Sequence, residues 1–172
     1  MKPNITLIGM MGAGKTTIGK LLSKTLNMGF FDMDAEIERE QDIPIVQIFE
    51  KFGEEHFRVL ENNLCKKILQ MNGVVISTGG GVVLNPENIS IIRQTSIAIY
   101  LHATPQSIYS RLLRDNSRPL LAGGQLLHIE EILKNRQHLY KGAADITITT
   151  ENKTPRKIVL EILPLLPLRE IT

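Results

Sequence analysis

The fold of this chain is decided by nine residues near its start, Gly9-Met10-Met11-Gly12-Ala13-Gly14-Lys15-Thr16-Thr17. They fit the pattern G-x-x-x-x-G-K-[ST], the phosphate-binding P-loop. A short apolar run over residues 5–8 comes before them, as in a buried parallel strand. An amphipathic helix pattern follows, with Ile18, Leu21, Leu22 and Leu26 on one face. Strand, glycine loop and helix in this order is the context that the motif requires, so we predict a nucleotide-binding loop rather than a chance glycine-rich turn.

The physical reason for this loop lies in its backbone. Glycines let consecutive N–H groups converge on one point, and the N-terminus of the following helix favours an anion there. Lys15 is expected to reach the β- and γ-phosphates, and Thr16 to offer its hydroxyl to Mg²⁺. We therefore expect the phosphates to be bound by Gly12, Ala13, Gly14, Lys15, Thr16 and Thr17.

Length and composition exclude several classes of protein. A chain of 172 residues predicts a single domain, 1–172, and 42% apolar with 22% charged residues is ordinary for a globular protein. The net charge of +2 gives no reason to expect a nucleic-acid or membrane partner. The one cysteine, Cys65, excludes an intrachain disulfide, and no apolar run approaches the roughly 18 residues of a membrane span. No signal peptide is recognisable at residues 1–4, so we expect a cytoplasmic protein.

Apolar runs alternate with helical patterns along the rest of the chain. Further strands are predicted over residues 29–33, 74–77, 97–101 and 146–149. Helices are predicted to begin at Asn85-Pro86, Thr104-Pro105 and Thr154-Pro155, where a capping residue precedes proline. Another helix is predicted over residues 54–71, with a buried stripe of Phe57, Leu60, Leu64, Ile68 and Met71. This alternation predicts an α/β fold with a parallel sheet covered by helices on both faces, and a ligand at the carboxyl ends of the strands.

Two acidic residues, Asp32 and Asp34, come at the end of the second predicted strand. Residues i and i+2 of a strand project from the same face, so we expect both carboxylates to point into the cleft beside the P-loop. One could hold Mg²⁺, directly or through water, and the other could accept a proton from a substrate hydroxyl. The alternative is that they form a solvated strand end or a helix cap.

Three consecutive glycines, Gly79-Gly80-Gly81, follow the third predicted strand. Such a run costs backbone entropy, and close approach of the backbone to a ligand would justify it. A tight strand-to-helix turn is the alternative.

Three arginines stay ambiguous on physical grounds alone. Arg58 and Arg136 lie in helical patterns, where an arginine is usually on the surface, although its planar fork suits a carboxylate. Arg118 lies in the glycine-bounded segment 114–125, whose composition suits a lid that could close over phosphates. The long, mostly helical connection over residues 35–71 is predicted to lie outside the core, like segment 114–125.

These motifs in their order resemble those of the shikimate kinase family over nearly the whole chain. The glycine loop is followed by the D-x-D of Asp32 and Asp34 and by F-R-x-x-E at Phe57, Arg58 and Glu61. After the triple glycine come R-P-L-L over residues 118–121 and R-x-x-x-Y at Arg136 and Tyr140.

The resemblance implies a fold, a reaction and residue roles. The fold is a P-loop NTPase-type sandwich with a five-stranded parallel sheet in the order 2-3-1-4-5, a substrate-binding subdomain within 35–71 and a lid at about 114–125. The reaction is phosphorylation of shikimate by ATP to shikimate 3-phosphate and ADP, with one Mg²⁺ ion per subunit. The resemblance also implies a monomer whose partners are the small molecules ATP and shikimate, without nucleic acid or membrane.

By the same resemblance, Arg58 and Arg136 hold the shikimate carboxylate, and Asp34 binds ring hydroxyls and is the candidate base. The backbone of Gly79, Gly80 and Gly81 lines that pocket. Asp32 supports Mg²⁺ through water, Arg118 and Lys15 stabilise the transferred phosphoryl group, and Arg111 and Pro155 flank the adenine.

The chain departs from the family pattern at two places. Asp42 stands near where a glycine is usual. Pro44 stands before Ile45, where a serine or aspartate is common. Two rival functions also stay open: a small P-loop kinase acting on gluconate or a nucleoside monophosphate, and a nucleotide-binding regulator without catalysis. Formation of ADP with each acceptor in turn separates these possibilities.

Overall fold

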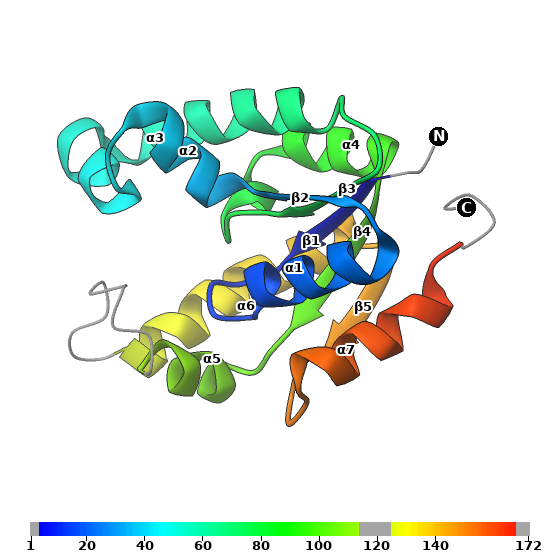
Figure 1. Ribbon diagram of the computed structural model, residues 1–172. Coiled ribbons are helices and arrows are strands. Elements are labelled where there is room, and N and C mark those ends of the chain that lie inside the picture. Colours follow the sequence, from blue (N-terminus) through cyan, green and yellow to red (C-terminus); the bar gives the residue numbers. More distant parts are fainter. Residues whose placement is uncertain (1–3, 114–124, 168–172) are drawn as a thin grey trace.

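The computed structural model describes residues 4–113 and 125–167, and Figure 1 shows their arrangement. Five strands form one parallel sheet in the order β2-β3-β1-β4-β5, which confirms the predicted topology. The strands are β1 (Asn4–Ile8), β2 (Gly29–Asp32), β3 (Val74–Ser77), β4 (Ser96–His102) and β5 (Ile146–Thr149). The helices are α1 (Lys15–Leu26), α2 (Met33–Gln41), α3 (Ile45–Ile68), α4 (Pro86–Thr95), α5 (Pro105–Leu112), α6 (Gln125–Ala143) and α7 (Pro155–Ile162), with short 3₁₀ turns η1 (Val82–Leu84) and η2 (Leu163–Leu165).

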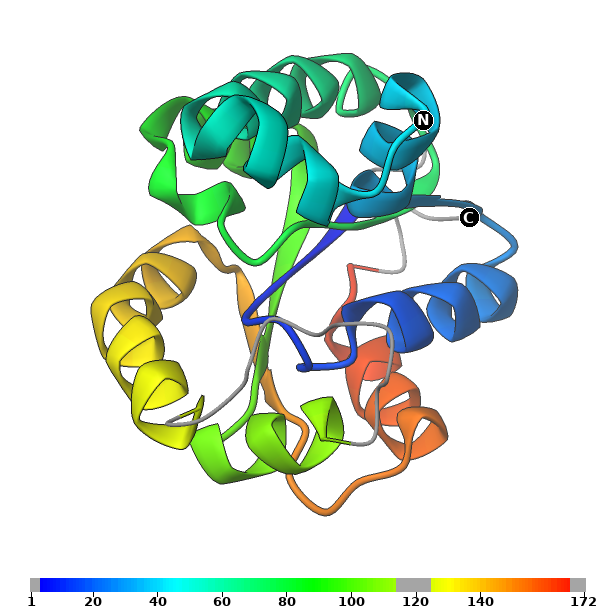
Figure 2. The ribbon, with the colours of Figure 1, turned by 90° about the vertical axis from the view of Figure 1, so that its left-hand side faces the viewer.

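Helices cover both faces of the sheet, as the buried strands require. Figure 2 shows α1 and α7 against one face and α6 against the other, where α4 also packs on β4. The central strands β1 and β3 are buried along their whole length, which explains why most of their residues are apolar. No described helix combines the length and the apolar character of a membrane span.

The predicted helix starts at the three X-Pro pairs are confirmed. Asn85, Thr104 and Thr154 each accept a hydrogen bond from a backbone N–H of the first turn, and the proline follows at the first helical position. Because proline has no N–H to leave unsatisfied, these starts are fixed by local chemistry and could be predicted from the sequence.

Several predicted boundaries are wrong. β1 and β4 each begin one residue earlier than predicted, and β4 ends one residue later, whereas two larger differences concern the second strand and the helix 54–71. The second strand ends at Asp32 and not at residue 33, because the Asp32 side chain accepts from the N–H of Ala35 and caps α2. The predicted helix 54–71 is the second half of α3, which ends at Ile68 and breaks at Gly53, where φ is 82°. Met71 therefore lies exposed beyond the helix. Leu60, which the predicted stripe places in the core, is only half-buried.

The topology gathers functional residues at one edge of the sheet. The P-loop follows β1, and Asp32 ends β2. Ser77 ends β3, and the three glycines come shortly after it. Since all strands are parallel, their carboxyl ends meet on one side, where residues of α3 and α6 line a hollow together with Asp32 and the glycine loop.

Candidate active site

The P-loop forms an anion cradle at the start of α1. Gly12 and Gly14 have φ values of 75° and 97°, which favour glycine, and Gly14 is the N-cap of the helix. The Lys15 ammonium donates to the carbonyl oxygens of Gly9 (2.8 Å) and Met10 (3.0 Å), which lie in the same loop. The loop amides, the helix N-terminus and Lys15 are thus brought together, as the motif predicted.

Three oxygen-bearing side chains meet beside this cradle. The Thr16 hydroxyl donates to Asp32 Oδ2 at 2.6 Å and lies 3.4 Å from the Ser77 hydroxyl oxygen. In the sheet Ser77 is the partner of Asp32 on one side and of Leu7 on the other. Hydroxyl and carboxylate oxygens are ligands that suit Mg²⁺, so the residues present fit this ion.

Sequence reasoning missed Ser77. It is a buried polar residue that ends the apolar run 74–76 directly before Thr78 and the triple glycine. A polar residue at the carboxyl end of a buried strand was the available signal.

Asp34 reaches the cleft by a different route from the one predicted. It lies in the first turn of α2 and not on a strand face, so the i, i+2 argument for Asp32 and Asp34 is wrong. Both carboxylates nevertheless line the same hollow beside the P-loop, because Asp32 caps the helix that carries Asp34. The alternative of a helix cap is thus correct for Asp32, and the cap still places Asp32 and Asp34 at the site.

The triple glycine loop has no room for side chains. A Cβ atom at Gly79 would lie 2.6 Å from Glu61 Oε1 and 2.9 Å from Asp34 Oδ1, and one at Gly81 would overlap the Arg58 guanidinium. At Gly80 it would lie 3.2 Å from the backbone nitrogen of Met11. The glycines therefore let this loop approach both the P-loop and the charged groups of α2 and α3.

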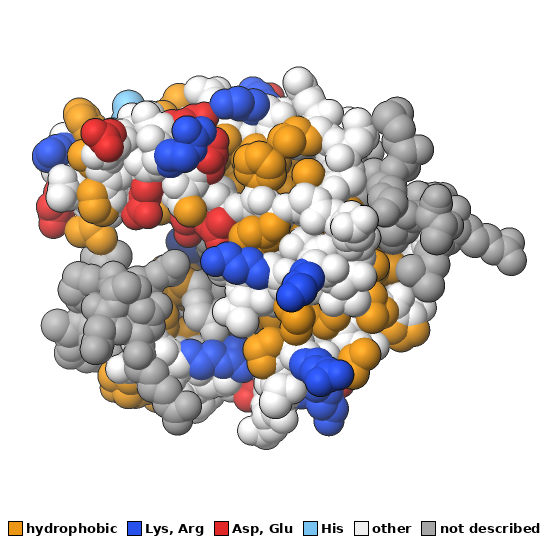
Figure 3. Space-filling view, viewed as in Figure 1, with side chains coloured by type: hydrophobic (Ala, Val, Ile, Leu, Met, Phe, Trp, Pro, Cys, Tyr) orange, Lys and Arg blue, Asp and Glu red, His pale blue; other side chains and the backbone are white. Residues whose placement is uncertain are grey.

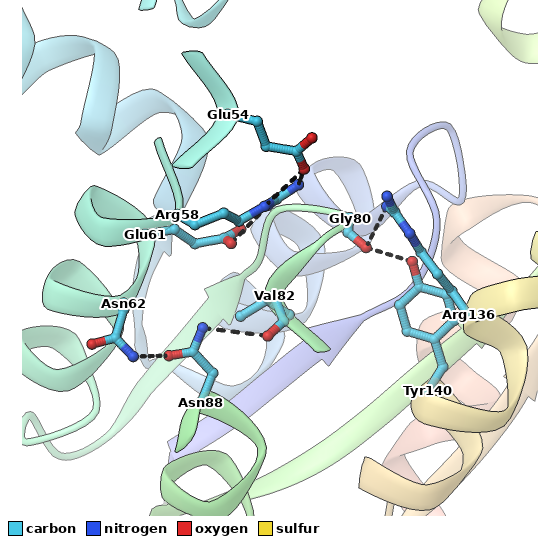
Figure 4. Close-up of polar contacts among 9 residues, drawn as sticks. All are labelled: Glu54, Arg58, Glu61, Asn62, Gly80, Val82, Asn88, Arg136 and Tyr140. Carbon is cyan, nitrogen blue, oxygen red and sulfur yellow. Dashed lines mark hydrogen bonds and ion pairs between the residues drawn. The ribbon is translucent and has the colours of Figure 1, made fainter. Parts of the chain in front are cut away.

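Arg58 is held by two carboxylates of its own helix, as Figure 4 shows. Its Nη1 donates to Glu61 Oε2 at 2.8 Å, while Nε and Nη2 donate to Glu54 Oε1 at 3.2 and 2.8 Å. Burial opposes the charge of Arg58, but Glu61 and Glu54 outweigh it, so its pKa is raised.

Glu61 is the buried member of this group, with 1% of its surface exposed. Burial raises the pKa of its carboxyl, and Arg58 offsets only part of that effect. Its Oε1 accepts no hydrogen bond from the described residues and faces Gly79.

Arg136 and Tyr140 approach the glycine loop from α6, on the side opposite Arg58 (Figure 4). The Tyr140 hydroxyl donates to the carbonyl oxygen of Gly80 at 2.5 Å, and Arg136 Nη1 lies 3.5 Å from the same oxygen. The structure thus brings together Asp34, Arg58 and Arg136, which lie far apart in the sequence.

Two adjoining hollows result from this arrangement. The smaller, of about 280 Å³, lies against the P-loop, Asp32, Asp34 and Arg111. The larger, of about 1040 Å³, lies between α2, α3 and α6, and Asp34, Arg58 and Arg136 line it. Two ligands could meet where the hollows adjoin, because six residues line both: Met11, Thr16, Asp32, Asp34, Gly80 and Leu112. Figure 3 shows acidic and basic side chains gathered over α2 and α3, the elements that form one wall of the larger hollow.

The remaining predicted residues have different outcomes. Arg111, on α5, donates to the carbonyls of Gly12 and Ala13 and to Thr150, so it lies against the P-loop. Pro155 lies exposed at the first turn of α7 and lines neither hollow. Arg118 and the expected lid, apart from Gln125 at the start of α6, lie outside the described residues.

Comparison with known proteins gives a consistent result. The family model for shikimate kinase matches residues 11–167. A shikimate kinase from Caldicellulosiruptor saccharolyticus is 44% identical over 153 residues, which make up 88% of each chain. The structure of shikimate kinase from Acinetobacter baumannii in complex with shikimate matches with a TM-score of 0.93 and 36% identity, over 100% of this chain and 97% of that one.

A gluconokinase from Sinorhizobium meliloti 1021 matches with a TM-score of 0.63 and 16% identity, over 94% of this chain and 90% of that one. At that identity the likeness extends to the fold alone.

Proposed function

The chain belongs to the shikimate kinase family, and on that premise we propose how its own residues transfer the γ-phosphoryl group of ATP to shikimate. ATP-dependent phosphorylation of shikimate, a step of aromatic amino-acid biosynthesis, is the reaction of this chain. We propose the 3-hydroxyl of shikimate as the acceptor oxygen.

One observation carries the proposal. The Gly80 carbonyl accepts from Tyr140 of α6, and a Cβ atom at Gly80 would crowd Met11 of the P-loop. A Cβ atom at Gly79 would collide with Asp34 and Glu61, and one at Gly81 would collide with Arg58. The phosphate cradle and a pocket with two arginines therefore meet at a single loop. A carboxylated ring held in that pocket would present a hydroxyl toward the γ-phosphate.

On the nucleotide side, the proposed ATP-binding residues are Gly12, Ala13, Gly14, Lys15, Thr16 and Thr17, with Arg111 beside them. Lys15 and the loop amides would stabilise charge on the transferred group. One Mg²⁺ ion per subunit would be held by the Thr16 hydroxyl and, through water, by Asp32, and would neutralise charge on the phosphates. Arg118 and Pro155 stay predictions for the phosphoryl group and the adenine.

On the acceptor side, Arg58 and Arg136 would bind the shikimate carboxylate, and the backbone of Gly79, Gly80 and Gly81 would line the pocket. Asp34 would accept the proton of the attacking hydroxyl. That oxygen then forms a bond to the γ-phosphorus while the bond to the β,γ-bridging oxygen breaks, which leaves ADP.

We also propose the larger organisation of the protein. The chain would act as one domain, with its substrate-binding subdomain within 35–71 and its lid at about 114–125. A cytoplasmic monomer fits the single cysteine and the small-molecule substrates. Sedimentation velocity at two protein concentrations measures the mass of the particle in solution, which should be that of one chain at both concentrations.

Two substitutions test the residue roles. Asp34→Asn removes the base but keeps the shape, so kcat should fall at least about 100-fold. Arg58→Ala removes a carboxylate contact, so chiefly the KM for shikimate should rise while the KM for ATP stays near that of the wild type. Steady-state ADP release measures both. Near-wild-type turnover of Asp34→Asn, or an unchanged KM for shikimate in Arg58→Ala, would remove the corresponding role.

A further inference from the structure

The carbonyl oxygen of Gly80 has two neighbours on α6 that differ in distance. The Tyr140 hydroxyl lies 2.5 Å away, a full hydrogen bond, whereas Arg136 Nη1 lies at 3.5 Å, the limit of such contacts. Tyr140 is therefore the principal donor to this carbonyl, and Arg136 is bound to it only weakly. Arg136 also lines the larger hollow.

Tyr140 is well placed to hold the loop, because the core fixes its ring. Its side chain is fully buried and stacks on Tyr100 of β4, with ring centroids 5.1 Å apart and an angle of 19° between the planes. Burial raises the pKa of the Tyr140 hydroxyl, and the charge of Arg136 and a hydrogen bond from its side chain offset only part of that effect, so the hydroxyl keeps its proton for the Gly80 carbonyl. Arg136 lies one turn earlier on the same face of α6.

We propose that Tyr140 is a positioning residue for the acceptor pocket: its hydroxyl satisfies the Gly80 carbonyl, which fixes the glycine loop and leaves the Arg136 guanidinium for the substrate carboxylate. Without that hydroxyl, the nearest donor to Gly80 is Arg136 itself. The guanidinium would then be drawn toward the loop and away from the substrate. This inference rests on the proposed role of Arg136.

The stacked pair supplies a matched control. Tyr100 and Tyr140 are both buried and lie in one stack, but the Tyr100 hydroxyl has no hydrogen-bond partner in the described structure. Replacing either tyrosine by phenylalanine removes one buried oxygen and keeps the ring. Only Tyr140→Phe removes a bond to the glycine loop.

The experiment compares Tyr140→Phe, Tyr100→Phe, Arg136→Ala and the double variant Tyr140→Phe/Arg136→Ala by steady-state kinetics and thermal unfolding. Tyr140→Phe should raise the KM for shikimate about 3- to 10-fold, the scale of one hydrogen bond, with the KM for ATP unchanged. Tyr100→Phe should leave both KM values unchanged. In the Arg136→Ala background, Tyr140→Phe should add little further loss, because both act on the same contact.

Three results would overturn the inference. They are an unchanged KM for shikimate in Tyr140→Phe, equal rises of both KM values with a lowered Tm, and full additivity with Arg136→Ala. If Arg136→Ala itself leaves the KM for shikimate unchanged, the proposed binding role of Arg136 fails, and the inference fails with it. A null result in Tyr140→Phe beside a large effect of Arg136→Ala rejects the role of Tyr140 alone.

Discussion

At the scale of single residues, Arg58 already has a carboxylate partner on each of its three donor nitrogens. Two of the five guanidinium N–H groups, one on each Nη, bind neither glutamate, so a substrate carboxylate at Arg58 competes with Glu54 and Glu61 for the same cation. Glu54 is the one expected to give way, because 59% of its side chain is exposed whereas Glu61 is buried. An exposed ion pair contributes little, so the exchange costs little free energy.

This argument predicts a gain in affinity on removing Glu54. In Glu54→Gln, the KM for shikimate should fall about 2- to 5-fold with kcat unchanged, because the competing charge is weakened. Glu55→Gln is the control, since it removes the same charge from a neighbouring exposed position that is not a partner of Arg58. A higher KM in Glu54→Gln would contradict the argument and show that Glu54 holds Arg58 in its binding orientation.

At the scale of elements, the backbone conformation of Asp42 explains why the family usually has a glycine near this position. Asp42 ends α2 with φ 55° and ψ 25°, the left-handed region that glycine adopts without strain. The usual family glycine near this position is thus explained by backbone geometry, and the aspartate tolerates the same geometry at some cost.

Restoring the glycine should stabilise the protein. Asp42→Gly should raise the free energy of unfolding by about 0.5–1 kcal/mol, while Asp42→Ala should lower it by about 1 kcal/mol, since alanine adopts a left-handed conformation poorly. Urea unfolding measures both, and the KM values should not change. A destabilised Asp42→Gly variant would mean that the aspartate side chain stabilises this turn.

The elements also show what the sequence could and could not predict. Alternation and the P-loop motif predict a parallel sheet covered by helices, the family resemblance alone implies the strand order, and three helix starts follow from X-Pro capping. The sequence predicts a second strand one residue too long, because Met33 is apolar like Phe30 and Phe31, whereas in the structure the capping bond of Asp32 makes Met33 the first residue of α2. The contacts of Gly80 with α6 span about sixty residues of sequence, and no local pattern encodes them.

At the scale of the whole molecule, the acceptor pocket places an ionisable group, Glu61, inside the protein, so stability and pH are linked. Because the pKa of Glu61 is raised in the folded state, the folded protein binds this proton more tightly than the unfolded chain. Its contribution therefore favours folding below the ordinary pKa of 4.5 and is lost as pH rises through the folded pKa.

The expected result is a specific difference between two pH profiles. The unfolding free energy of the wild type minus that of Glu61→Gln should decrease as pH rises above 4.5, by at most about 1.4 kcal/mol per pH unit. Urea unfolding between pH 4.5 and 7.5 measures it. Glu87→Gln is the control, because the pKa of exposed Glu87 is lowered, first by its hydrogen bond with Lys66, and its linkage has the opposite sign below 4.5. A difference that increases with pH above 4.5 would contradict the raised pKa of Glu61.

The most direct test of the account is ADP release by the purified protein with Mg-ATP in the presence of shikimate, of gluconate, or of neither. The two arginines, Asp34 and the glycine loop beside the P-loop predict rapid release with shikimate and only a slow background with gluconate or with no acceptor. Release that depends on gluconate would keep the nucleotide site and contradict the acceptor pocket. Binding of ATP without release in any of the three conditions would contradict the catalytic roles altogether.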